Sequence, residues 1–196
     1  MTVLNRFAGW LVCLTLVAAL PSAQAAPALK AGVFEPARQA PEFTLRGSDG
    51  NDLTLAHYRG KLVLMSFGFT HCTAVCPITL ATLAQTRQVL GAQASAVQVV
   101  FVTVDPERDD PAQMKAYLAA FDPSFIGGAG KPEVLAAMRK NYGVTAHKVP
   151  MSSGDYAVDH TASIFLIDRD GKLRAMMPYG HDAKDFVHDI QLLLAQ

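Results

Sequence analysis

Two almost continuous apolar runs, residues 61–67 and 97–104, constrain the fold of this chain more than any other feature. A strand with one face in water alternates apolar and polar residues, whereas a strand buried on both faces reads as an unbroken apolar run. A helical spacing of apolar residues over residues 76–90 follows the first run. After the second run, Asp110 and Pro111 form a helix start, a capping acid followed by proline at the first position, which predicts a helix to about residue 121. Buried strands that alternate with helices predict an α/β domain whose central sheet has helices on both faces.

Smaller elements are expected around this sheet. Residues 43–45 and 53–55 alternate about a Gly-Ser-Asp-Gly turn, which predicts a hairpin near the start of the domain. The glycine-rich residues 127–130 lack the Lys-Ser/Thr ending of a phosphate-binding loop. We therefore interpret them as a plain connector that leads to a short helix over residues 132–142.

The C-terminal part adds two strands and a helix. Residues 163–167 and 173–177 flank an Asp-Gly pair, which predicts antiparallel strands. Asp182 is placed to cap a last helix that runs to residue 194. The complete order is typical of a thioredoxin-like α/β fold: a mixed central sheet flanked by helices, with an N-terminal hairpin and one inserted helix.

The first 25 residues have the pattern of a secretory signal peptide. Arg6 gives a positive start, residues 8–20 are apolar, and Ala23-Gln24-Ala25 is a small-x-small cleavage site. The apolar run is short for a membrane-spanning helix of about 20 residues, so an uncleaved anchor is the weaker alternative. We therefore expect a periplasmic protein that is exported by a signal peptide, or one that is anchored to the inner membrane.

The rest of the chain is expected to form a flexible tether over residues 26–40 and one domain over residues 41–196. The whole chain has 17 basic and 17 acidic residues, which gives a formal net charge of zero. Nucleic-acid binding depends on basic surfaces that neutralise phosphates, so this balance excludes nucleic acid as the expected partner.

Two cysteines, Cys72 and Cys76, remain once the expected signal peptide, which contains Cys13, is removed. They lie where the first buried strand ends and a helix begins, the edge at which α/β sheets bind ligands. A helix N-terminus lowers thiol pKa values, and a four-residue offset places both sulfurs on one helical face. The geometry allows a disulfide or a two-thiolate metal site. A purely structural disulfide across so short a loop would add little stability.

A two-thiolate metal site needs a third ligand, and His160 is the best placed of the six histidines. It precedes a predicted strand, in a loop that lies against the cysteine-bearing helix in a thioredoxin-like sheet. Asp159 is placed to orient its imidazole. Two thiolates with an imidazole suit Cu(I) and also Zn(II), so ligand type alone does not choose the metal. The alternative for His160 is a loop histidine bonded to backbone.

Three blocks carry a more specific signal: residues 67–80 around the cysteines, residues 102–109 with the sequence Val-Thr-Val-Asp-Pro-Glu-Arg-Asp, and residues 158–161 with the sequence Val-Asp-His-Thr. In these blocks and their order the chain resembles the Sco/SenC family of copper-binding proteins, which assemble the dinuclear copper centre of cytochrome c oxidase. The resemblance spans residues 35–190. Within the second block, Asp105 follows a buried strand and is placed either to form a hydrogen bond near the site or to cap the loop before Asp110.

The resemblance implies a thioredoxin-like fold and a copper ion, Cu(I) or Cu(II), bound by Cys72, Cys76 and His160. It implies a copper metallochaperone whose partner is the copper-accepting subunit of the oxidase, with another copper chaperone or a thiol reductant as a further partner. One departure stands out. Thr73 and Ala74 occupy positions where family members usually have Pro and Asp, which removes a negative charge near the metal but no ligand.

The same cysteines support two other activities, so the sequence does not decide whether the chain is an enzyme. As a thiol–disulfide reductase it would prepare the oxidase subunit's cysteines for metal, with Cys72 as the attacking thiolate and Cys76 as its partner. The T-x-x-C-P spacing from Thr73 to Pro77 is that of a peroxiredoxin site. Those enzymes have a proline where this chain has Phe69, so peroxidase activity ranks last.

Overall fold

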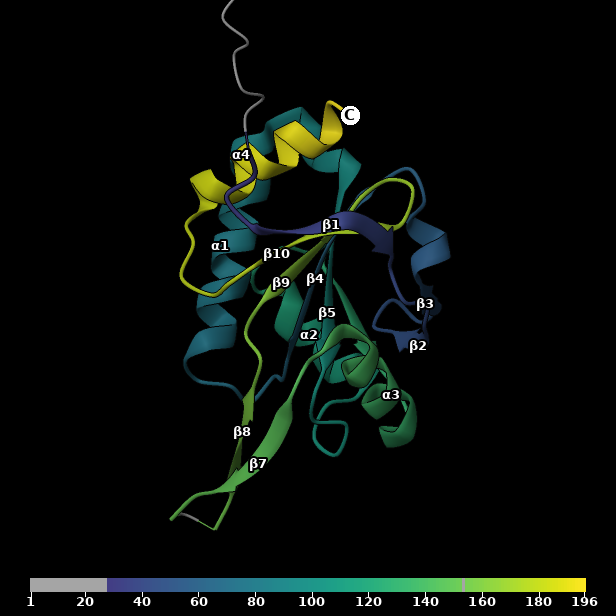
Figure 1. Cartoon of the computed structure of the whole chain (residues 1–196). Coiled ribbons are helices and arrows are strands. Elements are labelled where there is room, and N and C mark those ends of the chain that lie inside the picture. Colours follow the sequence, from purple (N-terminus) through teal and green to yellow (C-terminus); the bar gives the residue numbers. More distant parts are fainter. Residues whose placement is uncertain (1–27, 153) are drawn as a thin grey trace, which may run out of the picture.

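A computed structural model describes residues 28–152 and 154–196 (Figure 1). The expected signal peptide lies outside these described residues. Within them, no helix combines the length and the apolar character that a membrane crossing requires.

A mixed sheet of eight strands forms the centre of the domain. Its strands are β1 (Gly32–Gln39), β2 (Thr44–Gly47), β3 (Asp52–Thr54), β4 (Leu62–Gly68), β5 (Val97–Thr103), β6 (Ile126–Ala129), β9 (Ile164–Ile167) and β10 (Lys172–Met177). Their order across the sheet is β1-β10-β9-β4-β5-β6-β2-β3. Strand β5 runs parallel to β4 and to β6, and the other neighbours are antiparallel. The two predicted buried strands, β4 and β5, thus lie side by side at the centre.

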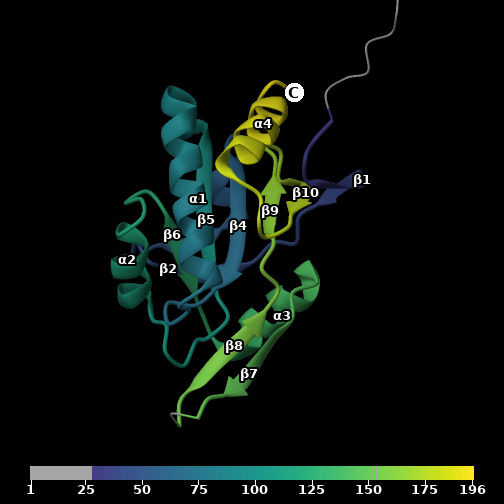
Figure 2. The ribbon, with the colours of Figure 1, turned by 90° about the vertical axis from the view of Figure 1, so that its left-hand side faces the viewer.

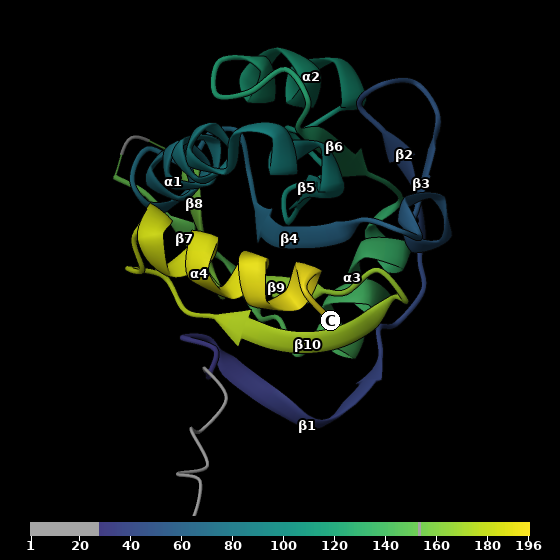
Figure 3. The ribbon, with the colours of Figure 1, turned by 90° about the horizontal axis from the view of Figure 1, so that it is seen from above.

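Helices cover both faces of this sheet (Figure 3). They are α1 (Val75–Leu90), α2 (Pro111–Ala119), α3 (Pro132–Tyr142) and α4 (Ala183–Leu194), with short 3-10 helices η1 (Leu55–Tyr58) and η2 (Gly91–Ala96). Helices α1, α2 and α4 lie on one face and α3 lies on the other. The predicted mixed α/β architecture is confirmed, together with the hairpin β2–β3, the antiparallel pair β9–β10 and all four predicted helices.

The glycine-rich residues 127–130 are not a plain connector, and that prediction is wrong. Residues 126–129 form β6, between β5 and β2. A Cβ on Gly127 would lie 2.8 Å from the Cβ of Met114 in α2, and one on Gly128 would lie 2.7 Å from Leu53 Cδ2. The strand is poor in β-formers because elements on both of its faces approach the backbone closely.

The prediction of a flexible tether over residues 26–40 is wrong for β1, which pairs with β10 at the edge of the sheet. Pro36 suggested a loop, but edge strands and bulges accept proline, and the β1 register shifts around this residue. The buried carboxylate of Asp189 in α4 accepts hydrogen bonds from the N–H groups of Lys30 and Ala31, at 2.7 and 2.9 Å. These contacts attach the segment to the domain.

A separate two-stranded sheet projects from the body of the domain (Figures 1 and 2). It consists of β7 (Ala146–Pro150) and β8 (Tyr156–His160). Only Val158 of this hairpin is buried. With most of its side chains exposed, the hairpin lacks the apolar pattern that reveals a strand, and the sequence did not predict it. His160 is accordingly the last residue of a strand, where a loop was expected.

Candidate functional site

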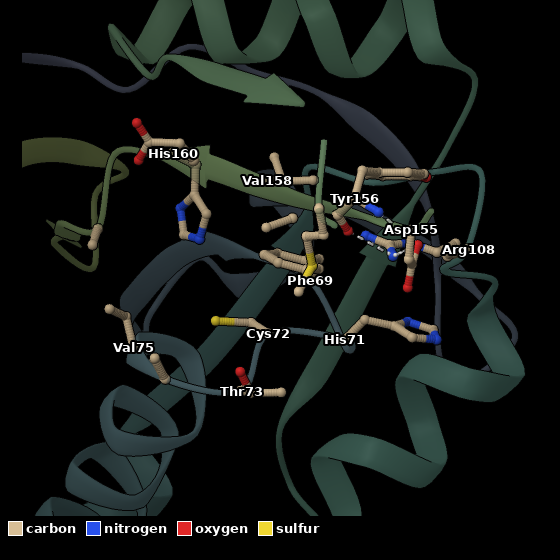
Figure 4. Close-up of a pocket in the computed structure, with 15 residues that line it drawn as sticks. Phe69, His71, Cys72, Thr73, Val75, Arg108, Asp155, Tyr156, Val158 and His160 are labelled. Carbon is tan, nitrogen blue, oxygen red and sulfur yellow. Dashed lines mark hydrogen bonds and ion pairs between the residues drawn. The ribbon is translucent and has the colours of Figure 1, made fainter. Parts of the chain in front are cut away.

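The two cysteines lie at the carboxyl ends of β4 and β5, where α1 begins (Figure 4). Both are free thiols. The prediction that both occupy one helical face is wrong for Cys72, which precedes α1, whereas Cys76 lies in its first turn. The N-cap residue Ala74 has φ −124° and ψ −81°, and its side chain makes no capping bond. The N–H of Cys72 donates to the carbonyl oxygen of Phe69 at 3.2 Å, which closes a turn between β4 and α1. Cys76 is buried, with 3% of its surface exposed.

Backbone amides at the start of α1 stabilise the Cys72 thiolate. Its Sγ accepts a hydrogen bond from the N–H of Cys76 at 3.4 Å. Partial burial by itself raises the pKa of the Cys72 thiol, but hydrogen bonds from the amides of Cys76, Ala74 and Val75 outweigh burial and lower the pKa below its ordinary value. Burial raises the pKa of the Cys76 thiol far above its usual range. The two thiols are therefore chemically distinct.

We expect Cys72 to be alkylated by iodoacetamide at least about tenfold faster than Cys76, because a single pKa unit changes the thiolate fraction that much and the thiolate is the nucleophile. The Cys72 rate should persist to lower pH than that of an ordinary cysteine, since its lowered pKa keeps the thiolate present there. Cys76 should react only after unfolding in urea. Mass spectrometry after limited alkylation at several pH values measures both rates, and equal labelling would contradict this assignment.

His160 faces Cys76 across the mouth of the site. Its Nε2 lies 3.6 Å from Cys76 Sγ, and its Nδ1 lies 3.0 Å from the carbonyl oxygen of Thr161. A carbonyl oxygen only accepts, so Nδ1 carries the proton and the Nε2 lone pair is directed at the sulfur. The expectation that Asp159 orients the ring is wrong, because the Thr161 carbonyl does so. The Phe69 ring supports the imidazole edge-on, with centroids 6.0 Å apart.

A pocket of about 510 Å³ opens beside these groups. The residues that line it include Phe69, Cys72, Arg108, Tyr156, Val158 and His160. The Cys72 sulfur and the His160 ring point toward the same side of this pocket (Figure 4). Across the described part of the chain, no three His, Cys, Asp or Glu side chains already stand at metal-binding distances from a common point. A metal held by the cysteines and His160 would therefore draw these side chains together.

The loop after β5 holds the cysteine segment, a role that the sequence did not reveal. The carboxylate of Asp109, 3% exposed, accepts bonds from Thr70 N–H at 3.1 Å, Thr70 Oγ1 at 2.6 Å and Thr103 Oγ1 at 2.7 Å. Of the two roles expected for Asp105, its side chain has the hydrogen bonds near the site: it accepts from Arg108 and from the Tyr156 hydroxyl, which both line the pocket. The only sequence signal was the specific block over residues 102–109.

Residues 33–195 match the family model described as SCO1/SenC. The chain is 38% identical over 157 residues to a mouse (Mus musculus) relative named "Protein SCO2 homolog, mitochondrial", covering 79% of this chain and 62% of the relative. It therefore spans less than two thirds of that protein. It is 33% identical over 180 residues to a "Putative copper-binding protein" of Stutzerimonas stutzeri, covering 89% of this chain and 88% of the relative.

Among solved structures, that of Bradyrhizobium japonicum ScoI with copper bound matches with a TM-score of 0.73 and 38% sequence identity. The match covers 79% of this chain and 99% of that chain. This likeness confirms the predicted thioredoxin-like fold with its mixed central sheet. Because the family model, the sequence identity and the shared fold agree, the chain belongs to the SCO1/SenC family.

Proposed function

We propose that this protein is a copper metallochaperone that binds one copper ion, Cu(I) or Cu(II), through Cys72, Cys76 and His160. The observation that carries the proposal is the approach of His160 Nε2 to Cys76 Sγ, 3.6 Å apart, beside the half-exposed Cys72. Two thiols and an imidazole nitrogen with a free lone pair are a donor set that suits copper, and zinc as well. The relatives named for copper support copper over zinc.

Copper delivery to the dinuclear copper centre of cytochrome c oxidase fits the shape of this site. Cys76 is buried, whereas Cys72 and His160 line an open pocket, so cysteines of an acceptor can reach the metal from one side. Exchange of one ligand at a time then moves the ion without releasing it to water. The proposed partner is the copper-accepting oxidase subunit, with another copper chaperone or a thiol reductant supplying metal or electrons. Such a role belongs in the periplasm, reached by an exported or membrane-anchored chain.

The difference between the two thiols favours a second candidate function, reduction of a disulfide on the same subunit. The Cys72 thiolate would attack one sulfur of the target disulfide and form a mixed disulfide, releasing the other target sulfur as a thiol. Cys76 would then lose its proton, attack the Cys72 sulfur and displace the target sulfur that is still bound to it. The target gains two electrons and two protons, and this chain ends with a Cys72–Cys76 disulfide. Both functions use the sulfur atoms of Cys72 and Cys76, but only copper delivery requires a bound metal ion, so copper binding distinguishes them.

The substitution His160→Ala tests the ligand set. We expect it to weaken copper binding by more than the roughly 10–100-fold loss seen when a residue that only orients a ligand is removed. The thiols should still form a disulfide on oxidation, because neither cysteine changes. Competition with a chromophoric chelator measures the affinity, and mass spectrometry measures the disulfide. His147→Ala, an exposed histidine on the neighbouring strand, is the matched control. Unchanged copper affinity in His160→Ala would exclude this ligand.

A further inference from the structure

The hairpin β7–β8 carries His160 but does not belong to the central sheet, where the cysteines follow β4. Within the residues that the structure describes, β8 pairs only with β7. The position of His160 relative to Cys76 therefore depends on contacts that attach the hairpin to the body of the domain. Val158 packs into the core, and most of the hydrogen bonds and ion pairs between the hairpin and the body converge on the loop that follows β5.

Arg108 in this loop is hydrogen-bonded to both sides of the junction. Its Nε donates to Oδ2 of Asp105 at the end of β5, a carboxylate that is 1% exposed. Its Nη1 donates to the carbonyl oxygen of Tyr156 in β8 at 3.0 Å and to Oδ1 of Asp155 at 3.1 Å. A planar guanidinium presents donors in a fixed fork, so these bonds set an orientation as well as a distance.

Tyr156 completes the attachment from the hairpin side (Figure 4). Its hydroxyl donates to Oδ1 of the same Asp105 at 2.9 Å. Its ring lies over the guanidinium, with Arg108 Cζ 3.8 Å from the ring centroid. On the neighbouring strand, Lys148 pairs with Glu107 at 2.6 Å, so a second strand of the hairpin reaches the same loop.

A chain of contacts continues from Arg108 to the imidazole. Arg108 Cζ lies 5.6 Å from the centroid of the Phe69 ring, and that ring supports His160. Arg108 thus contacts the strand that ends in His160 and also the aromatic ring against which His160 rests. In the part of the chain that the structure describes, Arg108 and Tyr156 form no hydrogen bond with Cys72 or Cys76, but through β8 and Phe69 they are connected to His160, the third proposed ligand.

We propose that Arg108 and Tyr156 are positioning residues for His160: they hold the β7–β8 hairpin so that the imidazole stands at the cysteine pair. They are not ligands. The test of this inference by copper affinity rests on the proposed copper function. The positioning itself is a property of the metal-free protein and can be tested without copper. Removing the whole Arg108 side chain leaves Asp105 buried without its cation, which also destabilises the fold. Arg108→Lys and Tyr156→Phe are therefore used, since lysine keeps the charge without the fork and phenylalanine keeps the ring without the hydroxyl.

The first test uses the reduced, metal-free protein. Nuclear Overhauser effects between the ring protons of His160 and Phe69 report whether the imidazole stays in place. We expect them to fall at least about twofold in Arg108→Lys, while folding, followed by circular dichroism, is retained. Arg46→Lys is the matched control, because Arg46 pairs with Asp52 on the exposed edge of the sheet and should leave the signals unchanged. Unchanged intensities in both Arg108→Lys and Tyr156→Phe would overturn the proposal.

The second test is a double-mutant cycle on copper affinity. If Arg108 acts through His160, Arg108→Lys should weaken copper binding about tenfold, as for other residues that orient a ligand. The same substitution should have less than about a twofold effect in the His160→Ala background, where there is no imidazole to position. An equal effect in both backgrounds would overturn the proposal. Failure of the unmodified protein to bind copper would instead refute the copper function, and the metal-free test would still decide the positioning.

Discussion

Cys76→Ser is expected to abolish tight copper binding, with a loss of affinity of at least about 100-fold, above the roughly 10–100-fold range for residues that only orient a ligand. A serine hydroxyl does not supply the soft thiolate that copper requires. The hydroxyl can still donate a hydrogen bond to His160 Nε2, so the buried site is expected to stay folded. Anaerobic titration with Cu(I) against a chromophoric chelator measures the loss.

The control for this substitution is Ala84→Ser. It places the same hydroxyl at another buried position of α1, about 12 Å further along the helix at 1.5 Å per residue, and it should leave copper affinity unchanged. Thermal unfolding of both variants separates loss of a ligand from loss of the fold. Wild-type affinity in a folded Cys76→Ser protein would show that copper does not depend on this sulfur.

Gly68→Ala is expected to lower the free energy of unfolding by about 1–3 kcal/mol, the usual cost of overfilling a packed core. Gly68 ends β4 directly beneath the site. An alanine Cβ would lie 2.5 Å from two ring atoms of Phe101 and 2.8 Å from Cys76 Sγ. Both neighbours are buried, so the strand, the ring or the sulfur must move. Copper affinity should therefore fall together with stability, which urea unfolding and metal competition measure.

Gly32→Ala is the matched control for this prediction. Gly32 also lies in a strand, but a Cβ there would meet only the carbonyl oxygen of Met176 at 3.6 Å, an ordinary contact. Its stability should change by less than about 1 kcal/mol, and its copper affinity should not change. If Gly68→Ala had no larger effect than Gly32→Ala, close packing beneath Cys76 would not be part of the site.

The sequence was sufficient to predict elements whose burial leaves an unbroken or regularly spaced set of apolar residues. Strands β4 and β5 are buried at every position, and the helices are bounded by strong signals. The Asp110 side chain accepts from Gln113 N–H at the start of α2, and Gly143 takes a left-handed conformation, φ 70°, after α3. These signals act within a few residues, which is why they can be recognised without the structure.

Elements set by distant contacts could not be recognised in the same way. Strand β6 consists largely of small residues because α2 and β3 approach its two faces, and neither approach leaves a local pattern. Strand β1 depends on β10, across more than a hundred residues. The β7–β8 hairpin is mostly exposed, so burial imposes little alternation on it.

The same difference between local sequence signals and contacts between distant segments applies to the site. The spacing of Cys72 and Cys76 and the resemblance together predict Cys72, Cys76 and His160 as ligands, and the fold places His160 Nε2 3.6 Å from Cys76 Sγ. The residues that hold it together were missed. Arg108 reaches Tyr156 across 48 positions, and Asp109 reaches Thr70 across 39. Such side-chain bonds between distant segments follow from tertiary structure alone.

The departure at Ala74 has a structural consequence. Ala74 is the N-cap of α1 and makes no side-chain capping bond, whereas an aspartate there would accept from the helix amides. In this chain the free amides of the first turn are directed to the Cys72 sulfur instead. Without an acid at position 74, these amides lower the pKa of the Cys72 thiol.

Copper binding by Cys72, Cys76 and His160 is tested most directly by an anaerobic Cu(I) titration of the reduced protein in competition with a chromophoric chelator. We expect one tightly bound copper per chain, lost in Cys76→Ser and weakened in His160→Ala. Absence of any binding that competes with the chelator would contradict it, and would leave thiol–disulfide exchange as the function of this cysteine pair.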